Sequence, residues 1–363
     1  MSKGPANEAL RRETEESFRA HQLKRRTDRE IRASPPRPGA EPMRVAYLEL
    51  LKLSLCDLAG ARTLSVSRTG DTRRPDVPVF SRELDPEELR LRVMGGDWPF
   101  SGLTMIGLER LDDLQACIES VIADRVAGDL IEAGTWRGGA AILARATLDS
   151  LGEHDRTVVL ADSFRGIPAP DEGNFPEDVD LDLSRVDFLS ASADEVQSHF
   201  NRFGLEHGIE FVPGFFSETL PGLRDRRWSV VRLDGDTYEA TWIGLESLYP
   251  GLSRGGYLII DDYGLIPECR AAVEDFRRDQ GITEPIANAD WNGVHWRRED
   301  EPDSAPPGVP SPRRRAVSAP HPPGGDARRA RIPTERELAL ERELSDLRER
   351  LGPAAGKPAG EPR

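Results

Sequence analysis

Short apolar runs alternate with longer helical patterns between residues 129 and 298, and this alternation restricts the fold more than any other feature of the sequence. It is typical of a doubly wound, Rossmann-like α/β fold, because parallel strands joined by helical crossovers form a sheet that is covered on both faces. Strands are predicted at 129–133, 157–162, 209–212, 229–233 and 257–260, with helices at 138–151, 193–203, 239–249 and 267–279. A hairpin of strands at 284–287 and 294–298 is expected to close the sheet edge.

The composition shifts on both sides of this pattern, which indicates flanks that differ from the folded domain. Four prolines between residues 34 and 42 end a charged, helix-like stretch, and eight prolines between 301 and 323 are typical of a disordered linker. Thr334 and Glu337 have the spacing of a capping box, which opens a helix. The predicted segments are a charged extension of low order at 1–43, the main domain at 44–298, a Pro-rich disordered linker at 299–333, a short amphipathic helix at 334–352 and a disordered end at 353–363.

The negative charge of the chain indicates which partners the main domain disfavours. The formal net charge is −15, and residues 44–300 alone hold 27 basic and 47 acidic residues. Such an acidic domain repels a phosphate backbone, so nucleic acid is excluded as a partner of the main domain. No stretch approaches the roughly 18 apolar residues of a membrane span, and the charged N-terminus lacks the apolar core of a signal peptide. We therefore expect a soluble, cytoplasmic protein without a membrane partner.

Cysteine and histidine offer no recognisable site in the sequence. Cys56, Cys117 and Cys269 lie far apart and form no CxxC pair, so neither a disulfide framework nor a zinc knuckle is indicated, and a reducing cytoplasm is expected. The six histidines form no HExxH spacing and are expected at the surface or in packing positions, although His295 on the last predicted strand could border the ligand crevice. Ser163 lacks the G-x-S-x-G context of a nucleophile.

A glycine-rich turn follows the first predicted strand and opens a helix, with the sequence Glu132-Ala-Gly134-Thr-Trp-Arg-Gly138-Gly139. Glycines at such a turn let the backbone approach a ligand closely, so a nucleotide-type ligand is expected there. The spacing G-x-x-x-G-G differs from the dinucleotide pattern and disfavours NAD. The next strand ends in Asp162-Ser163, where a doubly wound sheet places an acidic group against ribose hydroxyls. The alternatives are a purely structural turn and an aspartate that only caps the next turn.

Acidic side chains follow two further strands. Asp234 and Asp236 come directly after one predicted strand, and Asp261 and Asp262 come after the next. The carboxyl ends of neighbouring parallel strands meet at one edge, about 4.8 Å apart, so four carboxylates would crowd one small volume. A bound hard cation, Mg²⁺ or Ca²⁺, is the simplest explanation, because such ions prefer oxygen ligands. In the alternative, these aspartates cap helices or pair with Arg232 and Arg254.

Several motifs occur together and in order, and together they resemble the macrocin O-methyltransferase family, metal-dependent sugar O-methyltransferases of natural-product pathways. The resemblance covers residues 47–298. The motifs are Thr104-Met-Ile-Gly107 with Arg110-Leu111, residues 132–139, Asp162-Ser-Phe-Arg-Gly-Ile-Pro168, Phe216-Ser-Glu-Thr-Leu-Pro221, residues 232–238 and Asp261-Asp-Tyr263.

The resemblance implies a class I methyltransferase fold that uses S-adenosylmethionine and Mg²⁺. The acceptor would be a sugar hydroxyl of a glycosylated small molecule, and family members are often homo-oligomers. Residues 44–125 would form an N-terminal helical lid. The implied cofactor-binding residues are Thr104, Met105, Glu132, Gly134, Gly138, Asp162, Ser163 and Ser217. Asp234, Asp261 and Asp262 would bind Mg²⁺, and Asp236 would act as the general base.

The chemistry of metal-assisted deprotonation agrees with this assignment, and two alternative functions stay open. A hydroxyl coordinated to Mg²⁺ has a lowered pKa, and a nearby carboxylate takes its proton. A catechol or another phenol would suit the same chemistry as a sugar. A second alternative is a non-catalytic scaffold that recruits a partner through its C-terminal tail, although the complete set of four aspartates disfavours it.

Overall fold

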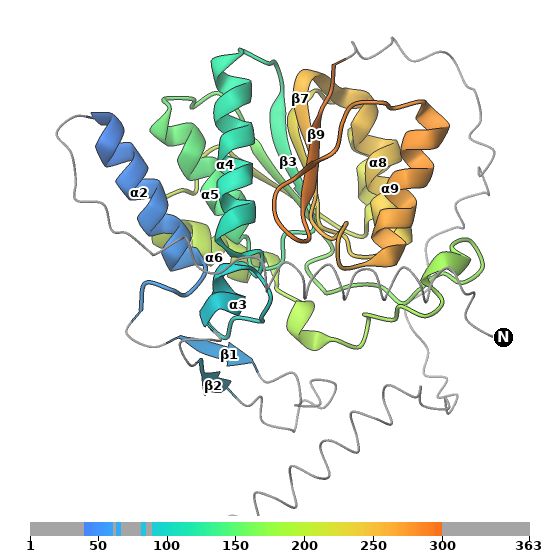
Figure 1. The fold of residues 1–363 in the computed structure, drawn as a ribbon, viewed down its shortest axis with the longest axis horizontal. Coiled ribbons are helices and arrows are strands. Elements are labelled where there is room, and N and C mark those ends of the chain that lie inside the picture. Colours follow the sequence, from blue (N-terminus) through green and yellow to red (C-terminus); the bar gives the residue numbers. More distant parts are fainter. Residues whose placement is uncertain (1–39, 61–62, 67–80, 85–88, 300–363) are drawn as a thin grey trace, which may run out of the picture.

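The computed structural model describes residues 40–60, 63–66, 81–84 and 89–299, and the predicted tail segments at 1–39 and 300–363 lie outside the described residues. A central sheet lies between two layers of helices (Figure 1). Its seven strands have the order β5-β4-β3-β6-β7-β9-β8. They are β3 (Asp129–Ala133), β4 (Val158–Asp162), β5 (Ile209–Pro213), β6 (Trp228–Leu233), β7 (Leu252–Ile260), β8 (Ala287–Asn288) and β9 (Val294–Arg297).

The sheet confirms the predicted α/β class. Strands β3 to β7 are parallel to their neighbours, whereas β9 pairs antiparallel with β7 and with β8. The prediction of a strand at 284–287 is largely wrong, because β8 contains only Ala287 and Asn288. Arg277 donates a hydrogen bond to the backbone oxygen of Glu284 at 2.5 Å, which holds this segment beside the end of the preceding helix instead of in the sheet.

Helices cover both faces of the sheet. Neighbouring strand residues such as Leu130 and Ile131 point to opposite faces, so each layer of helices has its own hydrophobic core. One layer contains α2 (Ala40–Leu55), α4 (Gly107–Ala123), α5 (Gly139–Ser150) and α6 (Ala193–Phe203), and the other contains α8 (Tyr238–Leu248) and α9 (Pro267–Gln280). The remaining elements are α3 (Leu89–Val93), α7 (Phe216–Thr219), β1 (Leu64–Val66), β2 (Ser81–Glu83) and four short 3-10 helices at Pro176–Asp178, Asp187–Leu189, Leu220–Leu223 and Tyr249–Gly251.

Local signals in the sequence fix several helix ends. Ser192 begins α6 and accepts a hydrogen bond from the backbone N–H of Glu195, while Thr237 caps α8 in the same way. Pro267 occupies the first turn of α9, where its missing N–H costs nothing. Gly204 and Gly281 end α6 and α9 in the left-handed conformation. These signals explain why the predicted helix bounds agree closely with the observed ones.

The segment before β3 differs from a simple helical lid. Helices α2 and α4 pack into the core with α5, because their buried residues belong to the same hydrophobic cluster. Strands β1 and β2 form a separate two-stranded antiparallel sheet, which the sequence did not indicate. Arg92, which is 2% exposed, binds Asp97 through two hydrogen bonds and fixes the turn after α3. Among the described residues of this segment, those that line the cavity described below lie between Gly95 and Arg110.

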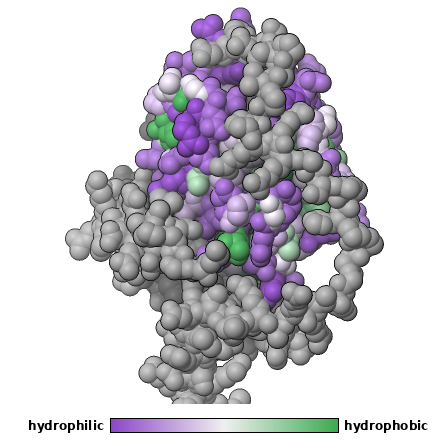
Figure 2. Space-filling view, turned by 90° about the vertical axis from the view of Figure 1, so that its right-hand side faces the viewer, coloured by the Kyte–Doolittle hydropathy of each residue, from purple (hydrophilic) through white to green (hydrophobic). Residues whose placement is uncertain are grey.

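Figure 2 shows the side that lies to the right in Figure 1. Hydrophilic side chains predominate on its described part, and hydrophobic ones occur only in small separate groups. Among the described residues, no helix is both long enough and apolar enough to cross a membrane.

A long connection between β4 and α6, residues 163–192, is tied to the other helical layer by the side chain of Asp178, besides the packing of Phe175 on Tyr238. Asp178 is 1% exposed and accepts hydrogen bonds from the backbone N–H groups of Tyr238 at 2.7 Å and Glu239 at 2.9 Å. These N–H groups open α8 and have no partner within their own helix. The carboxylate therefore caps α8 and anchors the connection beside the carboxyl ends of the strands.

Replacing Asp178 with alanine should lower the free energy of unfolding by about 1–3 kcal/mol, because two buried N–H groups would lose their partner. Asp180→Ala is the matched control, since Asp180 is exposed on the same connection, and its effect should stay within about 0.5 kcal/mol. Urea denaturation of both variants measures the difference. Equal stabilities would show that the Asp178 cap contributes nothing.

Candidate active site

A cavity of about 430 Å³ lies at the carboxyl ends of β3, β4, β6 and β7. This volume is within the range of roughly 300–1,000 Å³ that small-molecule sites occupy. In an open parallel sheet, ligands bind in the crevice at the carboxyl ends of the strands, at the point where the strand order reverses. The lining includes Gly95, Trp98, Thr104, Met105, Arg110, Glu132, Gly134, Asp162, Ser163, Asp178, Ser217, Asp234, Asp236, Glu239, Asp261, Asp262, Trp291 and Asn292.

Gly134 is required by the geometry of the turn after β3. Its φ is +90°, and a Cβ atom there would lie 1.8 Å from the backbone oxygen of Asp234. The backbone N–H of Gly134 donates to the oxygen of Ala161, and the N–H of Asp234 donates to the oxygen of Ala133. The turn therefore continues the pairing of three strands into the cavity wall, and the missing side chain lets the backbone of Gly134 pack against that of Asp234.

Asp162 holds two turns together from the end of β4. One of its carboxylate oxygens accepts from the backbone N–H of Thr135 at 2.7 Å and of Trp136 at 3.3 Å. The other accepts from the N–H of Phe164 at 2.8 Å. Asp162 thus caps the next turn, as the alternative expected, but it also lines the cavity. The two functions are compatible, because each carboxylate oxygen can accept more than one hydrogen bond.

Glu132 presents a buried carboxylate to the cavity from the end of β3. Its Oε1 atom accepts from Arg232 at 2.6 Å, whereas its Oε2 atom is buried and has no hydrogen-bond partner. Burial raises the pKa of Glu132 to about 8, although the charge of Arg232 acts in the opposite direction. A buried oxygen without a partner is costly, so a cationic or hydrogen-donating ligand group would be favoured beside it.

Three aspartates meet where β6 and β7 end. The register pairs Leu233 of β6 with Ile260 of β7, so the residues that follow these two lie side by side. Asp234, Asp261 and Asp262 each place a carboxylate oxygen within 4.8 Å of the others. The sequence prediction that these side chains gather at one edge of the sheet is confirmed.

Two arginines partly neutralise this cluster. Arg232 donates to Asp234 at 2.9 Å and to Asp261, while Arg110 from the first turn of α4 binds the other oxygen of Asp261. The alternative of an ion pair with Arg232 is therefore correct for Asp234 and Asp261. Arg254 makes no such pair among the described residues, because it lies exposed near the start of β7, away from the end where Asp261 follows.

Asp262 keeps an unpartnered carboxyl oxygen despite these arginines. Its Oδ2 atom is buried without a hydrogen-bond partner, and its Oδ1 atom accepts a long bond, 3.4 Å, from Asn292. Burial raises the pKa of Asp262 well above its usual range, and the nearby carboxylates of Asp236, Asp234 and Asp261 raise it further. The oxygen atoms and the excess of negative charge are what a hard divalent cation requires.

Asp236 lies two residues beyond Asp234, in the left-handed conformation with φ +61°. Aspartate is one of the few residues other than glycine that adopt this conformation readily. Burial, followed by repulsion from Asp234 and Asp261, raises the pKa of Asp236 to about 8. Its carboxylate lines the cavity and makes none of the hydrogen bonds or ion pairs found among the described side chains. It is therefore available to a ligand.

The other predicted residues fall into two groups. Thr104, Met105, Ser163 and Ser217 line the cavity as expected. Gly138 does not line it: this residue begins α5 with φ +83°, and a Cβ atom there would lie 2.8 Å from Val196 of α6. His295 does not border the cavity either, because its ring lies against α4, where it binds Asp113.

Sequence patterns alone missed several cavity residues. Arg110 was part of a recognised motif but had no predicted ion pair, although it binds Asp261 and, at 3.2 Å, Asp290. Trp291 and Asn292 come from the loop before β9, and Glu239 comes from the first turn of α8. The only available signal for Trp291 and Asn292 is their place on a loop beside the last strand, which is too weak to identify a site.

The turn at Gly134 allows a stability prediction with a matched control. Gly134→Ala should cost about 1–2 kcal/mol for the left-handed backbone and about 1–3 kcal/mol more for the clash with Asp234. Gly152 also has a positive φ, +77°, but a Cβ atom there would meet nothing within 4 Å, so Gly152→Ala should show the backbone cost alone. Chemical denaturation measures both variants, and equal losses would mean that the close approach to Asp234 is not a constraint.

The chain is similar to known methyltransferases of natural-product biosynthesis. A protein of Streptomyces olivaceus, 8-demethyl-8-(2,3-dimethoxy-alpha-L-rhamnosyl)-tetracenomycin-C 4'-O-methyltransferase, is 42% identical over 260 residues, which cover 71% of this chain and 94% of that protein. Demethyldecarbamoylnovobiocin O-methyltransferase of Streptomyces niveus is 43% identical over 221 residues, 60% of this chain and 84% of that protein. The solved structure of the O-methyltransferase NovP matches with a TM-score of 0.62 and 37% identity, covering 71% of this chain and 100% of that one.

The fold and the family agree. The seven-stranded, mostly parallel sheet with helices on both faces is that of the class I O-methyltransferases. Residues 60–298 match the family described as Macrocin-O-methyltransferase (TylF), which is more than half of the chain. The protein therefore belongs to the macrocin O-methyltransferase family.

Proposed function

We propose that this protein transfers a methyl group from S-adenosylmethionine to a sugar hydroxyl of a glycosylated small molecule, with Mg²⁺ held by Asp234, Asp261 and Asp262. The observation that supports this most strongly is the carboxylate cluster at the end of the cavity, where Asp262 keeps a buried oxygen without a partner. The relatives support the acceptor class, since one of them acts on a rhamnosyl tetracenomycin.

The cofactor side of the cavity fits S-adenosylmethionine. The unpartnered Oε2 atom of Glu132 suits the ammonium group of the methionine part, because a charge-assisted hydrogen bond would satisfy it. Gly134 lines the cavity directly after β3, where its backbone would lie beside the cofactor. Asp162 ends β4 and Ser163 follows it, and both would face the ribose. Ser217 would face the adenine from α7. Thr104 and Met105 would cover the cofactor from the segment before α4.

The metal side fits Mg²⁺ better than zinc. Its ligands would be carboxylate oxygens, which hard cations prefer, and no histidine or cysteine lines the cavity among the described residues. The two arginines fix Asp261 and Asp234 in place, whereas neither makes an ion pair with Asp262 among the described residues. A bound Mg²⁺ would favour ionisation of an acceptor hydroxyl beside it and orient that hydroxyl toward the methyl donor.

Asp236 is the residue best placed to take the proton. It lies in the same wall as Asp234, and its carboxylate has no partner to release before it can bind a hydroxyl. Its left-handed backbone turns it away from the regular path of the strand. The preceding Gly235 packs closely against α8, because a Cβ atom there would lie 2.8 Å from the Cβ atom of Ala240. A base held in fixed geometry beside a hydroxyl contributes typically 10²–10⁴-fold to a rate.

The Asp236→Asn variant tests both the reaction and the role of the base. We expect kcat for methylation of a rhamnosylated aromatic acceptor to fall about 10²–10⁴-fold, while calorimetric binding of S-adenosylmethionine stays unchanged. Asp225→Asn, at an exposed position outside the cavity, is the control and should keep full activity.

Three outcomes would contradict parts of this proposal. Full turnover in Asp236→Asn would remove this residue from the role of base. Methylation of catechol but not of the glycosylated acceptor would favour the phenol alternative. Failure of the wild-type protein to bind S-adenosylmethionine, with or without Mg²⁺, would reject the methyltransferase assignment and favour a scaffold.

Asp262→Asn tests the metal more cleanly than a change at Asp261, because Asp261 also neutralises two arginines. Loss of one carboxylate ligand should raise the Mg²⁺ concentration for half-maximal activity at least about 10-fold, the lower bound known for the loss of an outer-shell partner. EDTA should abolish turnover of the wild-type protein. Activity titrations with Mg²⁺ measure both effects, and an unchanged Mg²⁺ dependence in the variant would exclude Asp262 as a ligand.

A further inference from the structure

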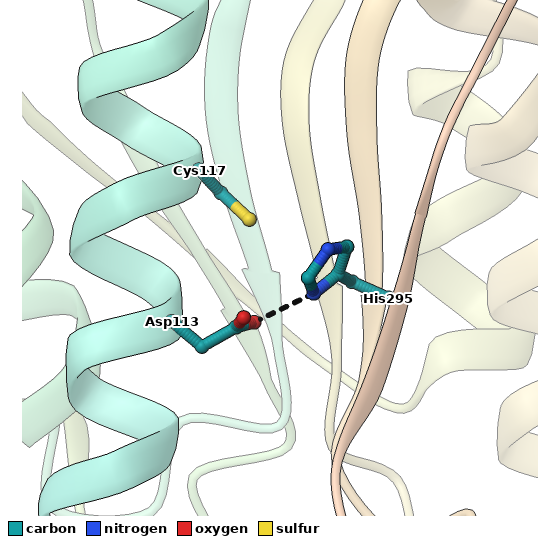
Figure 3. A group of neighbouring side chains, drawn as sticks. All are labelled: Asp113, Cys117 and His295. Atoms are coloured by element: carbon teal, nitrogen blue, oxygen red, sulfur yellow. Dashed lines mark hydrogen bonds and ion pairs between the residues drawn. The ribbon is translucent and has the colours of Figure 1, made fainter. Parts of the chain in front are cut away.

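A second group of metal-ligating side chains lies between α4 and β9, outside the cavity. Figure 3 shows Asp113 and Cys117 pointing from α4 toward His295 of β9. None of the three residues lines the cavity, and none is among the ligands assigned to Mg²⁺. The proposed methyltransferase function therefore does not use them.

The geometry of the group is compact. Asp113 and Cys117 are four residues apart on one helix, so they lie one above the other on the same face. The Oδ2 atom of Asp113 lies 2.9 Å from the Nδ1 atom of His295, and one ligand atom from each of the three residues lies within 4.8 Å of the others. A single small ion can be reached by all three side chains with only small movements.

Cys117 packs in the hydrophobic core that α4 shares with α2 and α5, and its thiol is the third ligand atom of the group. The residue is 3% exposed, and none of the hydrogen bonds among the described residues involves its sulfur. Its sulfur nevertheless points at a histidine and a carboxylate. Cys269, by contrast, is buried with a hydrogen-bond partner in Thr241. The buried thiol beside an imidazole and a carboxylate offers a sulfur, a nitrogen and an oxygen atom to one ion.

We propose that Asp113, Cys117 and His295 form a Zn²⁺ site that fastens α4 to the edge of the sheet. Sulfur, imidazole nitrogen and carboxylate oxygen are the usual ligands of zinc, whereas Mg²⁺ does not bind thiolates. Thiolate and carboxylate together neutralise the ion, and the thiol proton leaves to solvent on binding. The side chains of Asp113 and His295 are 15% and 19% exposed, which leaves a path for the ion and room for a water as fourth ligand.

The site has a mechanical consequence for the cavity. Helix α4 also carries Arg110, whose guanidinium binds Asp261 in the cavity wall. An ion between α4 and β9 would restrain the helix that positions this arginine, about two turns away from Cys117 along α4.

Co²⁺ serves as the probe, because it replaces zinc and absorbs light when a thiolate coordinates it. Protein stripped with EDTA and kept in excess Mg²⁺ is titrated with CoCl₂ and followed by absorption. We expect a thiolate-to-cobalt charge-transfer band that saturates at one equivalent and is displaced by Zn²⁺. Cys117→Ser should lose the band, whereas Cys269→Ser and Asp262→Asn should keep it, which separates this site from the Mg²⁺ site.

Absence of the band in the wild-type protein, or an equal band in Cys117→Ser, would overturn the proposal and leave an ordinary Asp113–His295 pair beside a packed thiol. Circular dichroism shows whether Cys117→Ser is folded. If it is not, His295→Gln replaces it and should bind Co²⁺ at least about 10-fold more weakly than the wild-type protein, since even the loss of an outer-shell partner costs that much. Unchanged affinity in a folded His295→Gln would also overturn the proposal.

Discussion

The rest of the site depends on the ion pairs that the guanidinium of Arg232 forms with three carboxylates. Arg232 lies in the central strand β6, is 3% exposed, and binds carboxylates from three neighbouring strand ends, those of Glu132, Asp234 and Asp261. Without it, three acids gathered by the parallel register would repel one another in a medium of low dielectric constant. The parallel sheet brings the three carboxylates together, and ion pairs with the arginine offset their mutual repulsion.

The two arginines of the site do not satisfy all of its carboxyl oxygens. Arg232 and Arg110 both bind Asp261, so the positive charge is concentrated on one aspartate. Glu132 and Asp262 each keep a buried oxygen without a partner, and both have raised pKa values chiefly because of burial. The proposed function assigns an ammonium group to the oxygen of Glu132 and a cation to that of Asp262. The fold thus leaves unsatisfied the groups that ligands would satisfy.

Aromatic contacts join the segments that cover the cavity. Phe188 stacks on Trp98 at 5.1 Å between ring centroids, and Trp136 donates a hydrogen bond from its indole nitrogen to the backbone oxygen of Phe188 at 2.8 Å. The guanidinium of Arg137 lies 4.3 Å from the centre of the Trp136 ring. Three segments that are distant in sequence, before α4, after β3 and before α6, are held together by this packing, which places the cover directly beside the glycine turn.

The sequence by itself determined the alternation of strands and helices, the helix ends at Ser192, Thr237 and Gly281, and the acidic residues after each central strand. These features depend on neighbours a few residues apart, through periodicity and capping, so they can be read along the chain. Only the tertiary structure decided that Arg110 binds Asp261 across 151 residues, and that Asp113 meets His295 across 182. Such contacts depend on how α4 packs against the sheet, and no local pattern encodes that packing.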